Sequence, residues 1–298
     1  IASASSERGP GPVEPVRELR IGEIPTLESG ADITLPIDEY WVPAEDQNLI
    51  LRAENVAMTS CMARFGLEWN APVIEVHAGG PSYDRLFGIS NLDEVTQYGY
   101  HAPGSGPLNA DGSTDDPVKE ANSYDYSDEQ DAVASGQTDL TEVNGVEIPA
   151  GGCITEVRSA LGTHNDPVLE LTERMIGYGA MQADKDPRVL AGFDRWSSCM
   201  AEAGHSYATP WDANNDPAWS TSRVTANEID VAVADVECQR ESNLLGLRVA
   251  VAAAWQRDYM RIHTDDFIGL RTTIAQQRAA AVSILAAAGQ RVTVTALG

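Results

Sequence analysis

The chain has 298 residues, of which 43% are hydrophobic, so it can bury a core that suits one large domain or two smaller ones. Its formal charge of -25 at pH 7 would repel a nucleic-acid backbone and an anionic membrane, which excludes both as partners. The acidity is confined to residues 1–218, because the segment from Trp219 to Gly298 carries eight acidic and eight basic residues.

The four cysteines indicate the compartment. They form no C-x-x-C pair, so zinc ribbons and thioredoxin-type motifs lack support, and an even number of separated cysteines is typical of an oxidised, exported protein. No apolar run of the sequence reaches the length of a transmembrane helix. We expect a mature secreted or extracytoplasmic product, free or associated with the cell surface, whose export signal was cut off or left out.

Residues 1–30 contain several prolines among Ser, Gly and Glu, which predicts a flexible N-terminal tail or a chain wrapped on the surface. The first helix is predicted after Pro43, whose ring suits the start of a helix. Apolar residues at helical spacing continue it to Phe65. Gly66 then ends the helix in a left-handed cap.

The middle of the chain is predicted to be mixed. Residues 72–77 have the composition of a short strand, and residues 92–98 that of a brief capped helix. Residues 103–148 are rich in Gly, Ser and Asp, which predicts an acidic insertion at the surface. Within it, Ser127 begins a short helix through a capping box, and Asn144-Gly145 is a strong signal for a β-hairpin.

Helices dominate after this insertion. One is predicted over residues 153–161, and two more begin where a capping aspartate precedes a proline, at Asp166-Pro167 and Asp186-Pro187. The last of these runs to Ala203, and Gly204 stops it.

The final helical region begins at Thr225, which forms a capping box with Glu228, and contains no proline before Ala288. Its apolar residues keep helical spacing, which predicts either one very long helix or a helix pair broken near Ser242-Asn243 or Gly246. Residues 292–294 are predicted to form a terminal strand.

A short motif occurs twice. Residues 61–72 and 199–210 share the pattern C-M-A-x-x-G-x-x-(aromatic)-x-x-P, and each copy is followed by another cysteine in a C-x-x-E context. Four cysteines allow three connectivities, and the duplication favours Cys61 with Cys153 and Cys199 with Cys238. The crossed pairing, Cys61 with Cys238 and Cys153 with Cys199, stays open.

The predicted fold class is therefore mainly α, a helical domain of two disulfide-stapled half-repeats with a small β-hairpin and a long C-terminal helix or helix pair. The domain covers residues 31–298. One half-unit spans residues 31–162 and contains the acidic insertion, and the other spans residues 163–298.

Several stretches resemble an uncharacterised family of exported proteins and lipoproteins of actinobacteria, the streptomycetes and their relatives. The resemblance covers most of the chain after residue 31 and implies an envelope or extracellular location, with no activity attached. It depends on Leu35-Pro36-Ile37-Asp38-Glu39-Tyr40, Cys61-Met62 with Phe65-Gly66, Tyr98-Gly99-Tyr100-His101, Gly151-Gly152-Cys153, Trp196 with Cys199-Met200, and Ala234-Asp235 with Cys238 and Asn243-Leu244.

Calcium is the one metal that the sequence suggests. An EF-hand frame that starts at Asn109 would use Asp111, Asp115 and Glu120 as ligands, but Thr114 occupies the position that requires glycine. A solvated acidic loop is the favoured interpretation, and we expect no cofactor apart from this candidate.

Four aromatic residues follow the two motif glycines, namely Trp69, Tyr207, Trp211 and Trp219. They could line a shared groove, although we favour the interpretation that they cover the disulfides and close the core. The sequence contains no G-x-S-x-G elbow, P-loop, H-E-x-x-H or dinucleotide motif. We therefore expect a non-catalytic secreted or cell-envelope binding or structural protein with an unknown protein or envelope ligand.

Two alternatives stay open. Abundant carboxylates allow a cell-wall glycan hydrolase that uses Asp and Glu. The charge-balanced region 226–288 allows an assembly protein that forms homo-oligomers through its C-terminal helix.

Overall fold

The computed structural model describes residues 19–76, 81–103, 126–221 and 223–290. Within these ranges the protein has ten α-helices, three short 3-10 helices and one two-stranded hairpin, which confirms the predicted mainly α fold class. The α-helices are α1 (Ala44–Ala63), α2 (Leu92–Tyr98), α4 (Asp128–Ser135), α5 (Gly152–Leu161), α6 (Pro167–Ala183), α7 (Pro187–Glu202), α8 (Pro210–Asn214), α9 (Ala226–Glu241), α10 (Leu244–Ile262) and α11 (Thr264–Ala287). The other elements are η1 (Gly30–Asp32), η2 (Pro36–Tyr40), η3 (Pro217–Trp219), β1 (Glu142–Val143) and β2 (Val146–Glu147).

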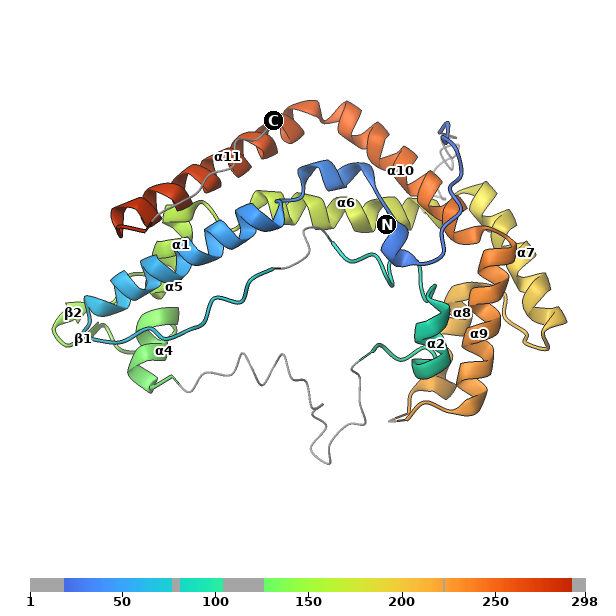
Figure 1. Ribbon diagram of the computed structural model, residues 1–298, viewed down its shortest axis with the longest axis horizontal. Coiled ribbons are helices and arrows are strands. Elements are labelled where there is room, and N and C mark those ends of the chain that lie inside the picture. Colours follow the sequence, from blue (N-terminus) through green and yellow to red (C-terminus); the bar gives the residue numbers. More distant parts are fainter. Residues whose placement is uncertain (1–18, 77–80, 104–125, 222, 291–298) are drawn as a thin grey trace, which may run out of the picture.

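Two hydrophobic cores lie at opposite ends of an elongated molecule (Figure 1). The large core is enclosed mainly by α2, α6, α7, α9 and α10, and the small core by α1, α4, α5 and the end of α11. Residue 162, where the two half-units were predicted to meet, does not separate these cores. Ile37 and Val95 belong to the large core, whereas Ala281 and Leu285 belong to the small one.

The two copies of the motif end their helices in the same way. Gly66 after α1 and Gly204 after α7 have φ angles of 70° and 92°, which glycine adopts at little cost. The N–H of the residue after each glycine bonds to the carbonyl of the motif methionine, at 3.2 Å for Met62 and 2.8 Å for Met200. Both methionine side chains are fully buried. Each copy is therefore a helix C-terminus of the Schellman type.

One disulfide is placed in each core. Cys61–Cys153 joins α1 to α5 with a Cα–Cα distance of 5.9 Å, and Cys199–Cys238 joins α7 to α9 with a distance of 5.6 Å. This is the pairing that the duplicated motif favours. Two disulfides are typical of a protein from an oxidising compartment. Among the described residues, no helix combines the length and the hydropathy that a membrane span needs.

Side-chain caps begin five helices as predicted. Each capping side chain accepts a hydrogen bond from a backbone N–H of the first turn, which satisfies a donor that has no partner within the helix. The capping residues are Asn91, Ser127, Asp166, Asp186 and Thr225.

The strand predicted over residues 72–77 is wrong for the part that the structure describes. Residues 67–76 run along α1 without regular secondary structure. The side-chain amide of Asn48 accepts from Val76 N at 2.7 Å and donates to the carbonyl of the same residue at 2.9 Å. Two turns further along α1, Asn55 donates to the carbonyl of Ala71 at 2.6 Å. The segment therefore forms its hydrogen bonds with asparagine side chains of α1. Among the described residues it has no neighbouring strand with which to form a β-ladder.

The region after Thr225 forms three helices rather than one or two. The first break is at Asn243, which has a left-handed φ of 47° and lies where one was predicted. The second break is at His263, between α10 and α11, and was not predicted. Asp265 and Asp266 follow it in the first turn of α11, where they complement the positive end of the helix dipole. The strand predicted over residues 292–294 lies outside the described residues.

The described part of the predicted N-terminal tail is packed, not free. Ile21 and Leu27 lie against the large core, and Arg188 of α7 donates to the carbonyl of Leu19 at 3.0 Å. Gly246 of α10 leaves room for this segment, because a Cβ there would lie 1.8 Å from the carbonyl oxygen of Pro25. Residues 19–29 are therefore a chain wrapped on the surface, the second of the two predicted forms.

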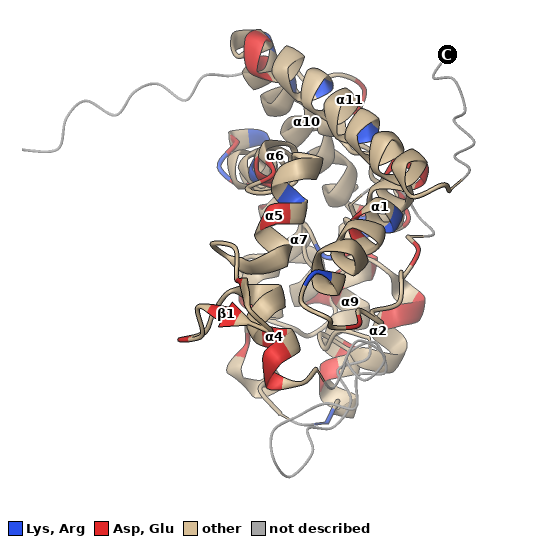
Figure 2. Ribbon diagram, turned by 90° about the vertical axis from the view of Figure 1, so that its left-hand side faces the viewer, with Lys and Arg blue, Asp and Glu red and all other residues tan. Residues whose placement is uncertain are grey.

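The described part of the acidic insertion, residues 126–148, contains six acidic residues and no basic one (Figure 2). It nevertheless contributes to the small core, because Val133 of α4 and Val143 of β1 are buried there. Asn144 and Gly145 turn the hairpin with positive φ angles, as predicted. Residues 104–125 lie outside the described ranges.

Candidate functional site

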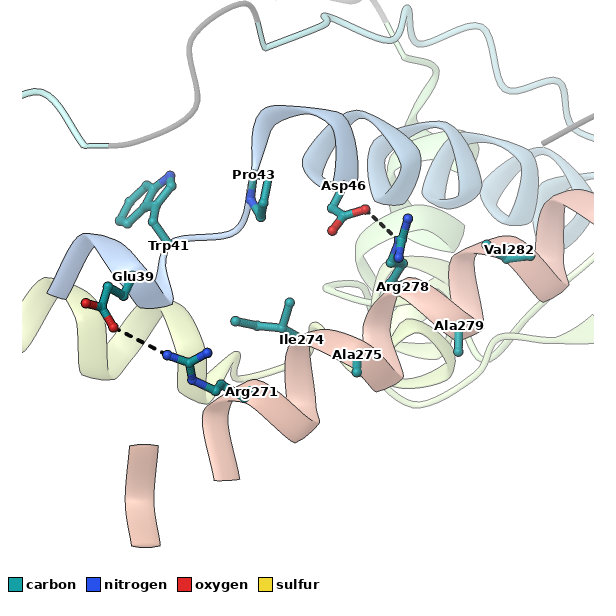
Figure 3. A pocket seen from close by; sticks show the side chains of 10 residues that line it. All are labelled: Glu39, Trp41, Pro43, Asp46, Arg271, Ile274, Ala275, Arg278, Ala279 and Val282. Carbon is teal, nitrogen blue, oxygen red and sulfur yellow. Dashed lines mark hydrogen bonds and ion pairs between the residues drawn. The ribbon is translucent and has the colours of Figure 1, made fainter. Parts of the chain in front are cut away.

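Two cavities meet at Trp41, which lies in the short connection between η2 and α1. The first, the α11 cavity, has a volume of about 630 Å³ and lies between η2, the start of α1 and α11 (Figure 3). The second, the α6 cavity, has a volume of about 450 Å³ and lies between α1, the α5–α6 connection and the start of α6. Both volumes fall in the range of small-molecule sites.

The charges of the α11 cavity are paired across its walls (Figure 3). Arg278 lies 2.9 Å from Asp46, and both side chains are largely buried. Nearer to solvent, Arg271 lies 3.4 Å from Glu39 and stacks over the ring of Tyr40. Each carboxylate in this cavity is thus neutralised by a guanidinium group. The remaining surface is apolar and comes from Trp41, Pro43, Ile274, Ala275, Ala279 and Val282.

The charged side chains of the α6 cavity are also engaged within the protein. At its rim, Arg158 of α5 lies 3.0 Å from Glu54 of α1. Asp166 also lines the cavity, and its carboxylate accepts from Val168 N at 2.9 Å as the cap of α6. Its carboxylates therefore have partners or structural tasks. The aliphatic walls are formed by Val42, Ile50, Leu51, Val76, Val168 and Leu169.

Two polar atoms of the residues that line the α6 cavity have no hydrogen-bond partner among the described residues. They are the indole Nε1 of Trp41 and the amide oxygen Oε1 of Gln277, and both atoms are buried. The side chain of Gln277 is only 1% exposed, and its Nε2 donates to the carbonyl of Gly162 at 2.9 Å. A buried donor or acceptor without a partner costs free energy, so the site holds one donor and one acceptor that a ligand could satisfy.

The four aromatic residues named as a possible lining of a shared groove are not brought together. Trp69 stacks on Tyr126 at 5.2 Å beside the small core, whereas Tyr207, Trp211 and Trp219 lie at the large core. Each of these three donates a hydrogen bond within the protein: Tyr207 to Asp216, Trp211 to Asp184, and Trp219 to the carbonyl of Ala213. Their placement fits the favoured interpretation that they close the core.

The calcium candidates Asp111, Asp115 and Glu120 lie outside the described residues, so calcium binding there stays a prediction. Within the described ranges, no three His, Cys, Asp or Glu side chains gather closely enough to hold a metal ion.

A buried carboxylate in the large core was not predicted. Asp235 of α9 is 1% exposed and accepts hydrogen bonds from Trp196, Gln239 and Tyr100 at 2.8, 2.9 and 3.0 Å. Burial raises its pKa to about 6, although the three hydrogen bonds and the charge of Arg248 oppose the shift. This carboxylate ties α9 to α7 and to the turn after α2, which is a structural task.

Arg248 of α10 is the second buried charge of the large core. Its guanidinium donates to both carboxylate oxygens of Asp184 at 2.9 Å and to the carbonyl of Phe87 at 2.6 Å. It also faces the rings of Phe87, Phe193 and Trp211. Nothing in the local sequence indicated this role, because the arginine stands alone in an apolar run.

The sequence also did not single out Trp41 or Gln277, which lie outside the duplicated motif. Trp41 is followed by Val42-Pro43 at the start of a helix, a pattern that marks a connection but not a cavity.

Comparison of the chain with protein-family models, with curated proteins and with solved structures finds no match.

Proposed function

We propose that this protein is a non-catalytic secreted or cell-envelope binding protein, and that the two cavities at Trp41 form its ligand site. The observation that carries the proposal is the pairing of the lining carboxylates: Glu39, Asp46 and Glu54 each face an arginine. Carboxylates held in ion pairs shape a neutral site, whereas acid–base catalysis needs a carboxyl group that can exchange its proton at the substrate.

The two disulfides support the proposed location, because such bonds persist in oxidising compartments. The resemblance to exported actinobacterial proteins points the same way. An envelope component is therefore the ligand class to test first.

The experiment measures binding and turnover together. The oxidised protein is incubated with purified cell-wall glycan and its soluble fragments, and equilibrium dialysis is combined with analysis of released products. We expect retention of a fragment without product, and loss of retention in Trp41→Ala. The matched control is Trp69→Ala, because Trp69 is half-buried but lines neither cavity.

Turnover would favour the alternative hydrolase. If products appear, and if Glu54→Gln or Asp46→Asn abolishes their release, the non-catalytic proposal is overturned. Absence of binding with every fragment would remove the cell wall as the source of the ligand.

The assembly alternative is favoured by two exposed side chains near the α10–α11 junction. Ile262 and Ile268 are 56% and 58% exposed. Residues 244–254 of α10 are buried inside the protein, so a homo-oligomer through region 226–288 could not use this part of α10. Light scattering at high concentration tests this, and a monomer there removes the alternative.

A further inference from the structure

We infer that the α6 cavity binds a neutral molecule with an aliphatic body and one group, a hydroxyl or a secondary amide, that accepts a hydrogen bond from Trp41 Nε1 and donates one to Gln277 Oε1. The inference deepens the proposed function, since it names the ligand chemistry of the same site.

The aliphatic part of the ligand follows from the walls and the rim. Leu169, which lines the cavity, is 47% exposed, and Ile74 is 54% exposed two residues before the lining residue Val76. Exposed aliphatic groups beside an apolar cavity gain most from a ligand that removes them from water.

The hydrogen-bonding part follows from the two unpaired atoms. An indole N–H only donates and an amide oxygen only accepts, so the pair is complemented by a group that does both. Hydroxyls and secondary amides have this property. An ether or a tertiary amide would satisfy Trp41 but leave the oxygen of Gln277 unpaired.

The neutrality of the ligand follows from the rim. Glu54 and Arg158 neutralise each other across the mouth of the cavity, and Asp166 is engaged at the start of α6. A charged ligand would lose hydration on entering the apolar cavity without gaining an unpaired counter-charge from these groups.

The ligand reaches the polar atoms through a movement of Trp41. Nε1 of Trp41 is buried in the ligand-free protein, while the side chain as a whole is half-buried and lies in a connection without regular structure. A turn of the indole toward the cavity exposes the N–H to the ligand. The hydrogen bonds formed there offset the cost of this turn, because both atoms start without partners.

The test observes the indole N–H directly. The chain has six tryptophans, so a ¹H–¹⁵N spectrum of the full protein contains six indole signals, and Trp41→Phe assigns that of Trp41 by its absence. Trp255→Phe assigns the matched control, because the Nε1 of Trp255 is also buried and unpaired but Trp255 lines neither cavity. The probes are n-pentanol, N-propylacetamide and butyl methyl ether, an isomer of pentanol that cannot donate.

We expect the Trp41 signal to move downfield with the alcohol or the amide, while the Trp255 signal stays in place. The ether should bind about threefold to tenfold more weakly than the alcohol. The Trp41→Phe substitution should weaken the binding of the tighter probe by a similar factor. Which of the two donors binds more tightly tells whether the natural group is a hydroxyl or an amide.

The inference is overturned if none of the probes shifts the Trp41 signal, if the ether binds as tightly as the alcohol, or if Trp41→Phe binds the probes as well as the parent does. Retention of an envelope fragment together with any of these results would leave the proposed function standing and remove only the ligand chemistry. If the probes bind as expected but no envelope fragment is retained, the ligand chemistry stands and the proposed function is removed.

Discussion

The imidazole of His101 lies against the carboxylate of Glu228, with 2.7 Å between Nδ1 and Oε1. Its other nitrogen, Nε2, lies 2.8 Å from the carbonyl oxygen of Thr221. Both neighbours are acceptors, and a neutral imidazole has only one N–H. The folded protein therefore favours the protonated form of the ring, which joins the turn after α2 to the start of α9.

This geometry predicts that the folded protein loses stability as the pH rises. The hydrogen bond to Thr221, followed by that to Glu228, raises the pKa of His101 above its usual 6.5, against the opposing effects of burial and of the charge of Arg85. A raised pKa means that the stabilisation is fully present below about pH 6.5 and is lost as the pH rises through the folded-state value. Thermal unfolding from pH 5.5 to 8.5 should show this fall, and His101→Gln should reduce the slope. An unchanged slope in the variant would contradict the prediction.

Asp235 should also make the folded protein more stable at mildly acidic pH than at neutral pH. Its pKa is raised from 3.8 to about 6, chiefly by burial, so its contribution is fully present below about pH 4 and is lost as the pH rises through about 6. The shift corresponds to about 3 kcal/mol. Asp235→Asn can still accept from Trp196 and donate to the hydroxyl of Tyr100, so it should remain folded and flatten stability between pH 4 and 7.

The His101→Gln background is the right one for this measurement, because it removes the overlapping titration of the histidine. Denaturant unfolding at each pH gives the free energy. A variant that keeps the slope of its background between pH 4 and 7 would contradict the raised pKa of Asp235.

Removal of either disulfide should lower the free energy of unfolding by a similar amount. The bridges close segments with sequence separations of 92 and 39 residues. In the chain-entropy model, Cys61→Ser with Cys153→Ser costs about 5 kcal/mol, and Cys199→Ser with Cys238→Ser about 4 kcal/mol. Denaturant unfolding of the two double variants measures these losses. Peptide mapping of the oxidised protein supplies the control, and crossed peptides would refute the pairing.

Gly246→Ala should release the N-terminal segment without breaking α10. The added Cβ would lie 1.8 Å from the carbonyl oxygen of Pro25, so the N-terminal segment has to move away from α10. Hydrogen exchange should then accelerate in residues 19–29 and stay slow in α10. The matched control is Gly269→Ala in α11, where nothing lies near the new methyl group and the helix should gain up to about 1 kcal/mol. Equal exchange in the parent and in Gly246→Ala would count against the proposed contact.

Much of the fold could be predicted because its signals are local. The caps at Asn91, Ser127 and Asp166 act on backbone groups two or three residues away, so sequence alone identifies them. The repeated glycines stop their helices for the same reason. The disulfide pairing followed from the duplication, which is also written in the sequence.

The rest depends on residues that are far apart in the sequence. Asp184 and Arg248 are separated by 64 positions, and neither shows its partner in its local pattern. The break at His263 had a local signal in the two aspartates that follow it, but the continuous apolar spacing concealed it. The cavities at Trp41 exist only because η2, α1, α6 and α11 converge there, so periodicity and motifs could not predict the candidate site.

The partnership of α1 with α11 has a consequence for biosynthesis. The small core contains Leu49 and Met62 near the beginning of the chain and Ala281 and Leu285 near its end. A ribosome that has completed α1 has more than two hundred further residues to add before the end of α11 can complete this core, whereas α4 and α5 become available earlier. Contacts of such long range close late in folding. The small core thus stays incomplete until the last helix emerges, even though α1, α4 and α5 can already pack against one another.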